Sequence, residues 1–206
     1  SPAEHVFLAL ELQRLGVRWV SLAPRFPGRF EKGVDYIGDV EALAVELRRH
    51  AAIARALGPY KLSLHSGSDK FSVYGPFTEA TGGLAHLKTA GTSYLEALRV
   101  IAGVAPELFR EILSFGRVRF PMDKASYHIS AELERVPEER TLRDDELPGL
   151  LDRFDARQVL HVTVGSALEA YGDALQAELR GHEAEHYAGL ERHFVKHVAP
   201  FAEAAR

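Results

Sequence analysis

The chain has 206 residues, 46% of them hydrophobic, and a formal net charge of −4. It can bury a sizeable core and is expected to form one domain, residues 1–206. The acidic balance argues against nucleic acid as a partner. The absence of cysteine excludes disulfides and cysteine metal sites, which leaves ten histidines and the acidic residues as metal ligands. No apolar run approaches the roughly 20 residues of a membrane span and no leader opens the chain, so we expect a cytoplasmic protein with no membrane partner.

Helices and strands are predicted to alternate along the chain. Apolar residues at helical spacing predict a helix over 5–15, with Ser1 and Pro2 as its cap and first residue, and a strand over 17–22. After a long loop rich in glycine and proline, Asp39 caps a helix that ends at Leu57. The later elements are strands over 60–65, 84–88, 125–130 and 157–164, and helices from 91–93, over 106–119, over 143–153 and up to about 200. Five such alternations are typical of a parallel sheet or a (β/α) barrel.

The strand over 60–65 runs into a loop that is dense in reactive side chains. Residues 66–70, Ser-Gly-Ser-Asp-Lys, place hydroxyls, a carboxylate and an ammonium around one glycine. A tight turn of this kind can offer its backbone N–H groups to an anion. An ordinary Asx or Ser turn uses the same residue types, but the whole set directly after a strand favours a functional loop.

Histidines occur at the ends of four predicted strands. They are His65, His86 (followed by Lys88), His128 and His161. In a (β/α) barrel the active site lies at the carboxyl ends of the strands, so these side chains would converge there. Neutral imidazoles with a carboxylate suit Zn²⁺, Mn²⁺ or Fe²⁺, although each histidine alone could be a buried structural residue.

Two further motifs have competing interpretations. The helix that opens at Thr92 and Ser93 could bind a carboxylate at its N-terminus, while Ser93 and Glu96 also fit a capping box. Residues 182–186 read His-Glu-Ala-Glu-His and match the zinc-hydrolase motif H-E-x-x-H. Because this helix is rich in His, Glu and Ala, a chance match is easy, and a zinc hydrolase is only a remote alternative.

Four stretches closely resemble the tagaturonate/fructuronate epimerases. They are residues 30–36 (FEKGVDY), 65–74 (HSGSDKFSVY), 86–97 (HLKTAGTSYLEA) and 127–130 (YHIS). The likeness covers nearly the whole chain, and the longer runs are specific. Family members are much longer, so the chain resembles their C-terminal portion. The resemblance therefore implies an α/β fold of the (β/α) TIM-type barrel class, here only part of a barrel with about five strands.

The resemblance also implies the chemistry. These isomerases interconvert D-tagaturonate and D-fructuronate by inverting C4 of a keto-hexuronate with a divalent metal, here Zn, Mn, Fe, Co or Ni. No nucleotide fingerprint is present, which favours a retro-aldol route over oxidation and reduction. The implied metal ligands are His128 and His161, with a further ligand in the missing part. The implied catalytic residues are His65, Asp69, His86 and Lys88, and the implied substrate-binding residues are Ser66, Ser68, Lys70, Thr92 and Ser93.

An alternative function is a non-catalytic, sugar-acid-binding half-barrel, which would bind the anion without a metal. An incomplete barrel would expose unpaired sheet edges and lack some active-site residues. We therefore expect the chain to pair with the missing N-terminal half or with a second copy of itself, and to be inactive alone.

Overall fold

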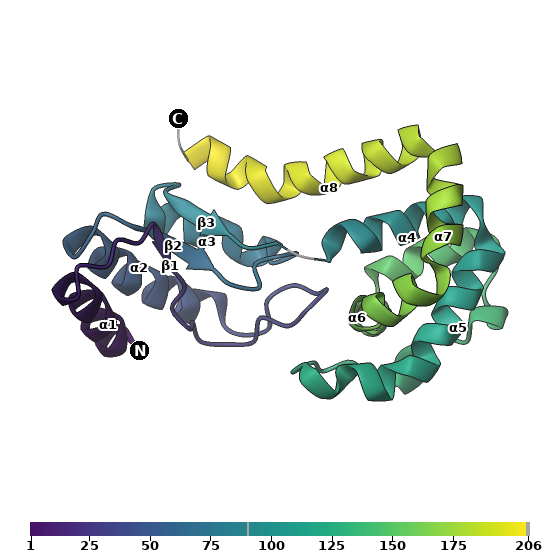
Figure 1. Ribbon diagram of the computed structural model, residues 1–206, viewed down its shortest axis with the longest axis horizontal. Helices are drawn as coiled ribbons and strands as arrows, with labels where there is room; N and C mark the ends of the chain where they lie inside the picture. Colours follow the sequence, from purple (N-terminus) through teal and green to yellow (C-terminus); the bar gives the residue numbers. More distant parts are fainter. Residues whose placement is uncertain (90, 205–206) are drawn as a thin grey trace. The chain divides into compact units, whose positions relative to one another are not determined.

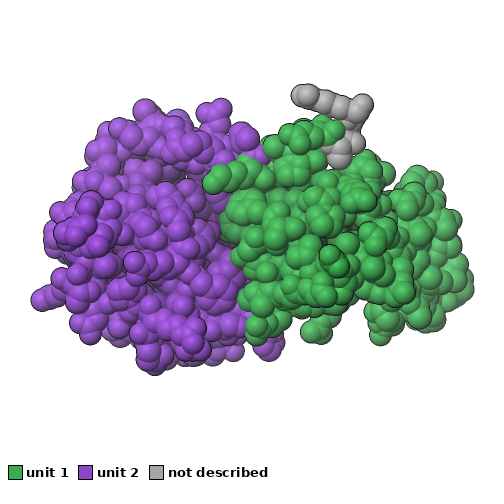
Figure 2. Space-filling model, turned by 180° about the vertical axis from the view of Figure 1, so that it is seen from behind, with its two compact units in different colours: residues 1–30, 35–89, 196–206 green, residues 31–34, 90–195 purple. Residues whose placement is uncertain are grey.

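The structure, a computed structural model, describes residues 1–89 and 91–204 (Figure 1). It divides into two compact units (Figure 2): unit 1 is Ser1–Phe30, Asp35–Thr89 and Lys196–Arg206, and unit 2 is Glu31–Val34 and Ala90–Val195. The last helix, α8 (Glu183–Ala204), contributes residues to both units. The prediction that residues 1–206 form a single domain therefore stays a prediction.

Unit 1 is built on a three-stranded parallel sheet with the strand order β1-β2-β3. Its elements are α1 (Pro2–Arg14), β1 (Ser21–Leu22), α2 (Val40–Ala56), β2 (Lys61–Leu64), α3 (Phe71–Thr81) and β3 (Ala85–Leu87). The predicted strands at 60–65 and 84–88 are confirmed in position. The first strand is shorter than the predicted 17–22.

The sheet has one apolar and one polar face. Leu62 and Leu64 of β2 are almost fully buried in a core that they share with residues of α2 and α3. Because side chains alternate along a strand, Ser63 lies on the opposite face. Strands of parallel sheets are usually apolar on both faces, so the polar face of unit 1 is unusual.

The first two helices begin where the sequence predicts. Ser1 caps α1 in a capping box with Glu4, and the side chain of Asp39 accepts hydrogen bonds from the backbone N–H groups of Glu41 and Ala42 at the start of α2. These contacts satisfy backbone donors that the first helical turn leaves without partners.

Unit 2 is helical. Its α-helices are α4 (Thr92–Val104), α5 (Pro106–Asp123), α6 (Phe154–Val162), α7 (Val164–Gly181) and the first part of α8, and its 3₁₀ turns are η1 (Lys124–Ser126), η2 (Leu133–Arg135), η3 (Glu139–Thr141) and η4 (Asp144–Asp152). Leucine, isoleucine, valine and phenylalanine from α4, α5, α6 and η4 form its apolar core.

The predicted TIM-type barrel of about five strands is wrong. In the described ranges, three short parallel strands and one isolated bridge between Arg29 and Ile37 are the only β-structure. The predicted strand at 157–164 is mostly helix α6. Gln158, Val159, Leu160, His161 and Val162 are all buried, so the helix is covered on more than one face. A short apolar run of this kind does not distinguish a buried helix from a strand.

The predicted strand at 125–130 is also wrong. Residues 124–126 form the turn η1 at the end of α5, and the chain then runs irregularly. Ser130 donates its backbone N–H to the carboxylate of Glu31 instead of to a neighbouring strand. A side chain thus takes the place that a strand ladder would have filled.

No helix in the described part of the chain is long and apolar enough to cross a membrane. The cytoplasmic location stays a prediction.

Candidate functional site

The polar sheet face of unit 1 carries a hydrogen-bonded histidine. Ser63 and His86 are register partners on β2 and β3, and the Oγ of Ser63 lies 3.1 Å from Nδ1 of His86. The Oγ of Ser21 on β1 lies 3.4 Å from the same nitrogen. All three strands therefore contribute to one row of polar side chains. With Nδ1 engaged by serine hydroxyls and the His86 side chain exposed, Nε2 is the nitrogen presented for chemistry.

His65 and Lys88 follow the carboxyl ends of β2 and β3. Both side chains are exposed, and the alternation of the strands directs them to the same face as Ser63 and His86. The backbone of Lys88 bonds to Leu64 at 3.3 Å and accepts from Gly67 at 2.9 Å, which extends the ladder past β3. The structure thus brings three of the four predicted catalytic residues, His65, His86 and Lys88, onto one small sheet.

The loop after β2 has an unusual backbone. Ser66 and Asp69 adopt positive φ angles of 57° and 59°, a conformation that is uncommon for non-glycine residues. Between them, a Cβ on Gly67 would lie 2.4 Å from a Leu87 methyl group, so only glycine fits. The Tyr74 hydroxyl donates to the Gly67 carbonyl and fixes the loop from α3. Burial raises the pKa of Tyr74, so this hydroxyl remains a donor.

The predicted anion-binding residues of this loop differ in exposure. Ser66 is partly exposed, with its Oγ 3.0 Å from Nδ1 of His65. Ser68 and Lys70 are buried, and Nζ of Lys70 donates to the Ser68 carbonyl at 2.9 Å. In this structure the Lys70 ammonium therefore braces the loop. Its predicted contact with substrate stays a prediction.

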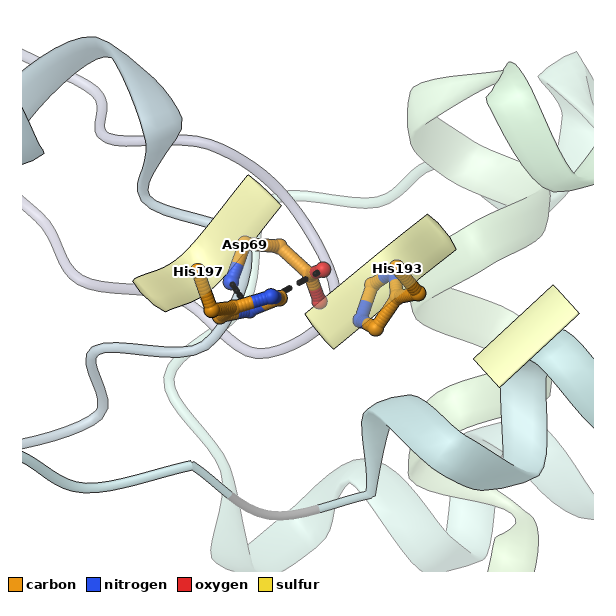
Figure 3. A group of neighbouring side chains, drawn as sticks. All are labelled: Asp69, His193 and His197. Carbon is orange, nitrogen blue, oxygen red and sulfur yellow. Dashed lines mark hydrogen bonds and ion pairs between the residues drawn. The ribbon is translucent and has the colours of Figure 1, made fainter. Parts of the chain in front are cut away.

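Helix α8 brings two histidines to the same loop. The boundary between the units falls within this continuous helix, and His193 and His197 lie four residues apart, on one helix face. Among the described residues, one group of His, Asp and Glu side chains has metal-compatible spacing: a carboxylate oxygen of Asp69 and one ring nitrogen each of His193 and His197 lie within 4.8 Å of one another. Figure 3 shows the Asp69 carboxylate beside both imidazole rings. All three side chains are buried.

Each histidine of this group has a second partner. Nδ1 of His193 lies 3.5 Å from an oxygen of Glu96 on α4, and both residues belong to unit 2. A carboxylate on one ring nitrogen orients an imidazole and raises its basicity as a metal ligand through the other nitrogen. Nε2 of His197 accepts the backbone N–H of Asp69 at 3.1 Å. A metal bound through that nitrogen would replace this hydrogen bond.

The donor set fits a divalent transition metal. Two imidazoles and one carboxylate are ligands that Zn²⁺, Mn²⁺, Fe²⁺, Co²⁺ and Ni²⁺ accept, and three protein ligands leave coordination positions for a substrate. Packing fixes His197, whose ring contacts Phe71 and Tyr74 at centroid distances of 5.0 Å and 5.7 Å.

The other predicted site residues lie in unit 2. Helix α4 begins at Thr92 as predicted, but its N-cap is Gly91, and Glu96 pairs with Arg99 and His193 rather than closing a capping box. Thr92 is buried and Ser93 is exposed at the helix start.

The two predicted metal ligands are not on strands. His128 is exposed in the irregular segment after η1, whereas His161 is buried on α6 against the backbones of Gly33 and Gly91. The prediction that His128 and His161 lie at the ends of adjacent strands is therefore wrong. Their role as ligands stays a prediction. Among the described residues, the group whose spacing suits a metal is Asp69, His193 and His197, and it does not include them.

The H-E-x-x-H motif straddles a helix boundary. His182 ends α7 and caps the start of α8, with its Nδ1 3.0 Å from the Glu178 carbonyl, so it does not share a regular helix face with His186. This geometry differs from the single helix on which a zinc hydrolase holds two ligands.

The sequence alone does not single out His193 and His197 as candidate ligands. Their spacing of four residues in a predicted helix was the available signal, because such spacing places two side chains on one face. The third member, Asp69, lies more than 120 residues earlier, and only the fold reveals that it meets them.

A parallel sheet with polar side chains at the carboxyl ends of its strands is typical of enzymes that act on small molecules. The model of the family "UxaE: tagaturonate epimerase" matches residues 1–201. The chain is 50% identical over 200 residues to the tagaturonate/fructuronate epimerase of Thermotoga maritima, covering 96% of this chain and 42% of that protein. The native crystal structure of the fructuronate-tagaturonate epimerase UxaE from Cohnella laeviribosi superposes with a TM-score of 0.95 at 40% identity, over 98% of this chain and 43% of that one. A glycerol complex of the same enzyme also has a TM-score of 0.95.

The chain therefore belongs to the tagaturonate epimerase family, and the predicted resemblance is confirmed. It spans less than half the length of the relatives that it matches.

Proposed function

We propose that this chain forms part of a metal-dependent epimerase that interconverts D-tagaturonate and D-fructuronate. The observation that carries the proposal is the buried group of Asp69, His193 and His197, which joins the loop after β2 to helix α8 in a member of this family. The loop with Asp69 follows strand β2, and Ser63 of the same strand bonds to His86 on β3. This polar sheet face supplies groups for proton transfer.

The reaction inverts C4 and needs no external oxidant. In the retro-aldol route, a base removes the proton from the C4 hydroxyl while the C3–C4 bond breaks, which yields an aldehyde and an enediolate. The aldehyde then turns its other face, the C3–C4 bond forms again, and the proton returns to the oxygen on C4. A divalent metal supplies electrostatic stabilisation for the negative charge of the enediolate.

His86 is the best-positioned group for this proton transfer. Ser63 and Ser21 fix its Nδ1, so its exposed Nε2 can accept and return a proton at the C4 oxygen. Lys88 and His65 flank it on the same face, where an ammonium can pair with the substrate carboxylate. Asp69, predicted as a catalytic residue, acts in this proposal as a metal ligand with the two histidines of α8.

The test uses a full-length protein, in which this chain is joined to the part of its relatives that it does not match. Conversion of D-tagaturonate is followed by ¹H NMR after chelation and after each divalent metal is added back. We expect conversion only with metal, and no conversion of uncharged ketohexoses, because an unpaired ammonium and a missing carboxylate contact weaken their binding.

A matched pair of variants tests the role of the sheet face. His86→Phe should abolish conversion, whereas His186→Phe on α8 should retain it. Conversion that survives both chelation and His86→Phe would refute the proposal. Binding of D-tagaturonate without any conversion would instead establish the non-catalytic, sugar-acid-binding alternative.

A further inference from the structure

Helix α3 begins directly after the loop that carries Asp69, and its own residues do not cap it. Lys70 is the N-cap residue, and its ammonium donates to the Ser68 carbonyl. Residues 71–74, the first turn, include no acidic side chain. Because an α-helix begins with four backbone N–H groups that have no partner within the helix, an acceptor for them has to come from another part of the chain or from water.

Asp35 supplies such an acceptor from 37 residues earlier in the sequence. Its two carboxylate oxygens accept the backbone N–H of Ser72 at 3.3 Å and 3.1 Å, and Oδ1 also accepts the Ser72 hydroxyl at 2.9 Å. Ser72 is the second residue of α3, and this is the position whose N–H an N-cap side chain normally binds. The negative charge of Asp35 also suits the positive end of the helix dipole. Asp35 therefore caps α3 from a distant loop.

This cap fixes the far end of the loop between β2 and α3. The near end is held at Gly67, whose N–H donates to the Lys88 carbonyl at 2.9 Å and whose carbonyl accepts the Tyr74 hydroxyl. Between the two ends, Asp69 has a φ of 59°. A non-glycine residue keeps such a backbone conformation only where the surrounding contacts hold it. The contact made by Asp35 lies within one helical turn of Asp69, so it is one of those that hold this conformation.

We infer that Asp35 is a positioning residue for the metal site, because its cap on α3 holds Asp69 in the conformation that a metal ligand needs. Asp35, Asp69 and His197 all belong to unit 1, and the N–H of Asp69 donates to Nε2 of His197 at 3.1 Å. Without the cap, the loop would open more often. The apparent metal affinity would then fall with the fraction of molecules in which the ligand is in place. The inference rests on the proposed function for the metal itself.

A second aspartate provides a matched control for a merely structural role. Asp39 is exposed like Asp35 and caps α2 through the N–H groups of Glu41 and Ala42, at 2.8 Å and 3.1 Å. Asp39→Ala therefore also removes a helix cap, but α2 carries no proposed metal ligand. The conservative variant Asp35→Asn retains a carbonyl oxygen that can accept the Ser72 N–H, and it removes only the charge.

Two measurements on the full-length protein test the inference. Hydrogen exchange of residues 66–72 without metal measures how often the loop opens, and equilibrium dialysis against Co²⁺ measures metal affinity. In Asp35→Ala we expect about tenfold faster exchange and about tenfold weaker Co²⁺ binding, because residues that orient metal ligands typically contribute about 10- to 100-fold to affinity. Asp35→Asn and Asp39→Ala should stay within about twofold of the wild type in both measurements, although Asp39→Ala should lower the urea midpoint as much as Asp35→Ala does.

The inference is overturned if residues 66–72 exchange at the same rate in Asp35→Ala as in Asp39→Ala, or if Asp35→Ala binds Co²⁺ like the wild type. Equal losses in Asp35→Asn and Asp35→Ala would also overturn it, because the charge and not the cap would then be responsible. If the wild type binds no Co²⁺, the proposed metal site itself is refuted. That result is distinguishable, because the exchange measurement contains no metal.

Discussion

Glu31 holds the segment of unit 2 that carries His128, and removing its carboxylate should release that segment. Its side chain is 5% exposed and accepts from the N–H of Ser130 at 2.7 Å, from the hydroxyl of Ser130 at 2.6 Å and from Nε2 of Gln158 at 3.0 Å. Nε2 of Gln158 has a second acceptor, the Lys32 carbonyl at 3.1 Å. Both donors of Ser130, its backbone N–H and its hydroxyl, thus bond to Glu31.

The expected cost follows from these contacts. A hydrogen bond to a charged group contributes about 1.5–3 kcal/mol. Ser130 is only partly buried, so water can replace part of what its two donors lose, and Glu31→Ala should lower the free energy of unfolding of unit 2 by about 2–3 kcal/mol. Glu31→Gln retains one acceptor oxygen and should cost about 1–2 kcal/mol.

Urea unfolding measures the stability change, and hydrogen exchange of the Ser130 amide measures the local effect directly. The control is Glu134→Ala, an exposed glutamate of η2, which should stay within about 0.5 kcal/mol of the wild type. Glu31 does not hold this segment if Glu31→Ala costs no more than this control, or if the Ser130 amide exchanges at its wild-type rate.

Three further changes test other parts of the structure. Ser63→Ala should lower the rate of conversion, because it removes a hydrogen bond that orients the His86 ring; an unchanged rate would contradict this role. Burial, followed by repulsion from His50, lowers the pKa of His5 to about 4. Between about pH 4 and about pH 6.5 the unfolded chain binds a proton at His5 and the folded chain does not. The urea midpoint should therefore fall as the pH drops from about 6.5 through about 4, and it should fall less in His5→Phe than in the wild type. Gly91→Ala should lower the thermal midpoint, because Gly91 has a φ of +78° and the new Cβ would lie 2.4 Å from the imidazole of His161. Gly103→Ala should not lower it, because the space around Gly103 is open.

Local signals predicted much of unit 1. Ser1 and Asp39 begin their helices as expected because capping depends on residues close in sequence. The alternation of Leu62, Ser63 and Leu64 identified β2 and correctly separated its apolar face from its polar face.

The errors arose where tertiary contacts decide the structure. The apolar run around Val159 is short enough to suit a strand or a helix, and packing in the core of unit 2 selects the helix. The segment ending at Ser130 is irregular and bonds to the side chain of Glu31, which no sequence pattern indicates. The group at Asp69 joins residues from two distant parts of the chain, so spacing alone could suggest only its two histidines.

Asp69, His193 and His197 are proposed to hold the metal, and the metal stoichiometry after dialysis against a fixed trace of divalent metal depends on them if they do. We expect close to one metal per wild-type chain and a sharp loss in His197→Ala, because a site with three protein ligands loses most of its affinity when one is removed. His128→Ala and His161→Ala should retain the metal. Wild-type occupancy in His197→Ala, together with loss of metal in His128→Ala and His161→Ala, would rule out this ligand set and place the metal at the other histidine pair.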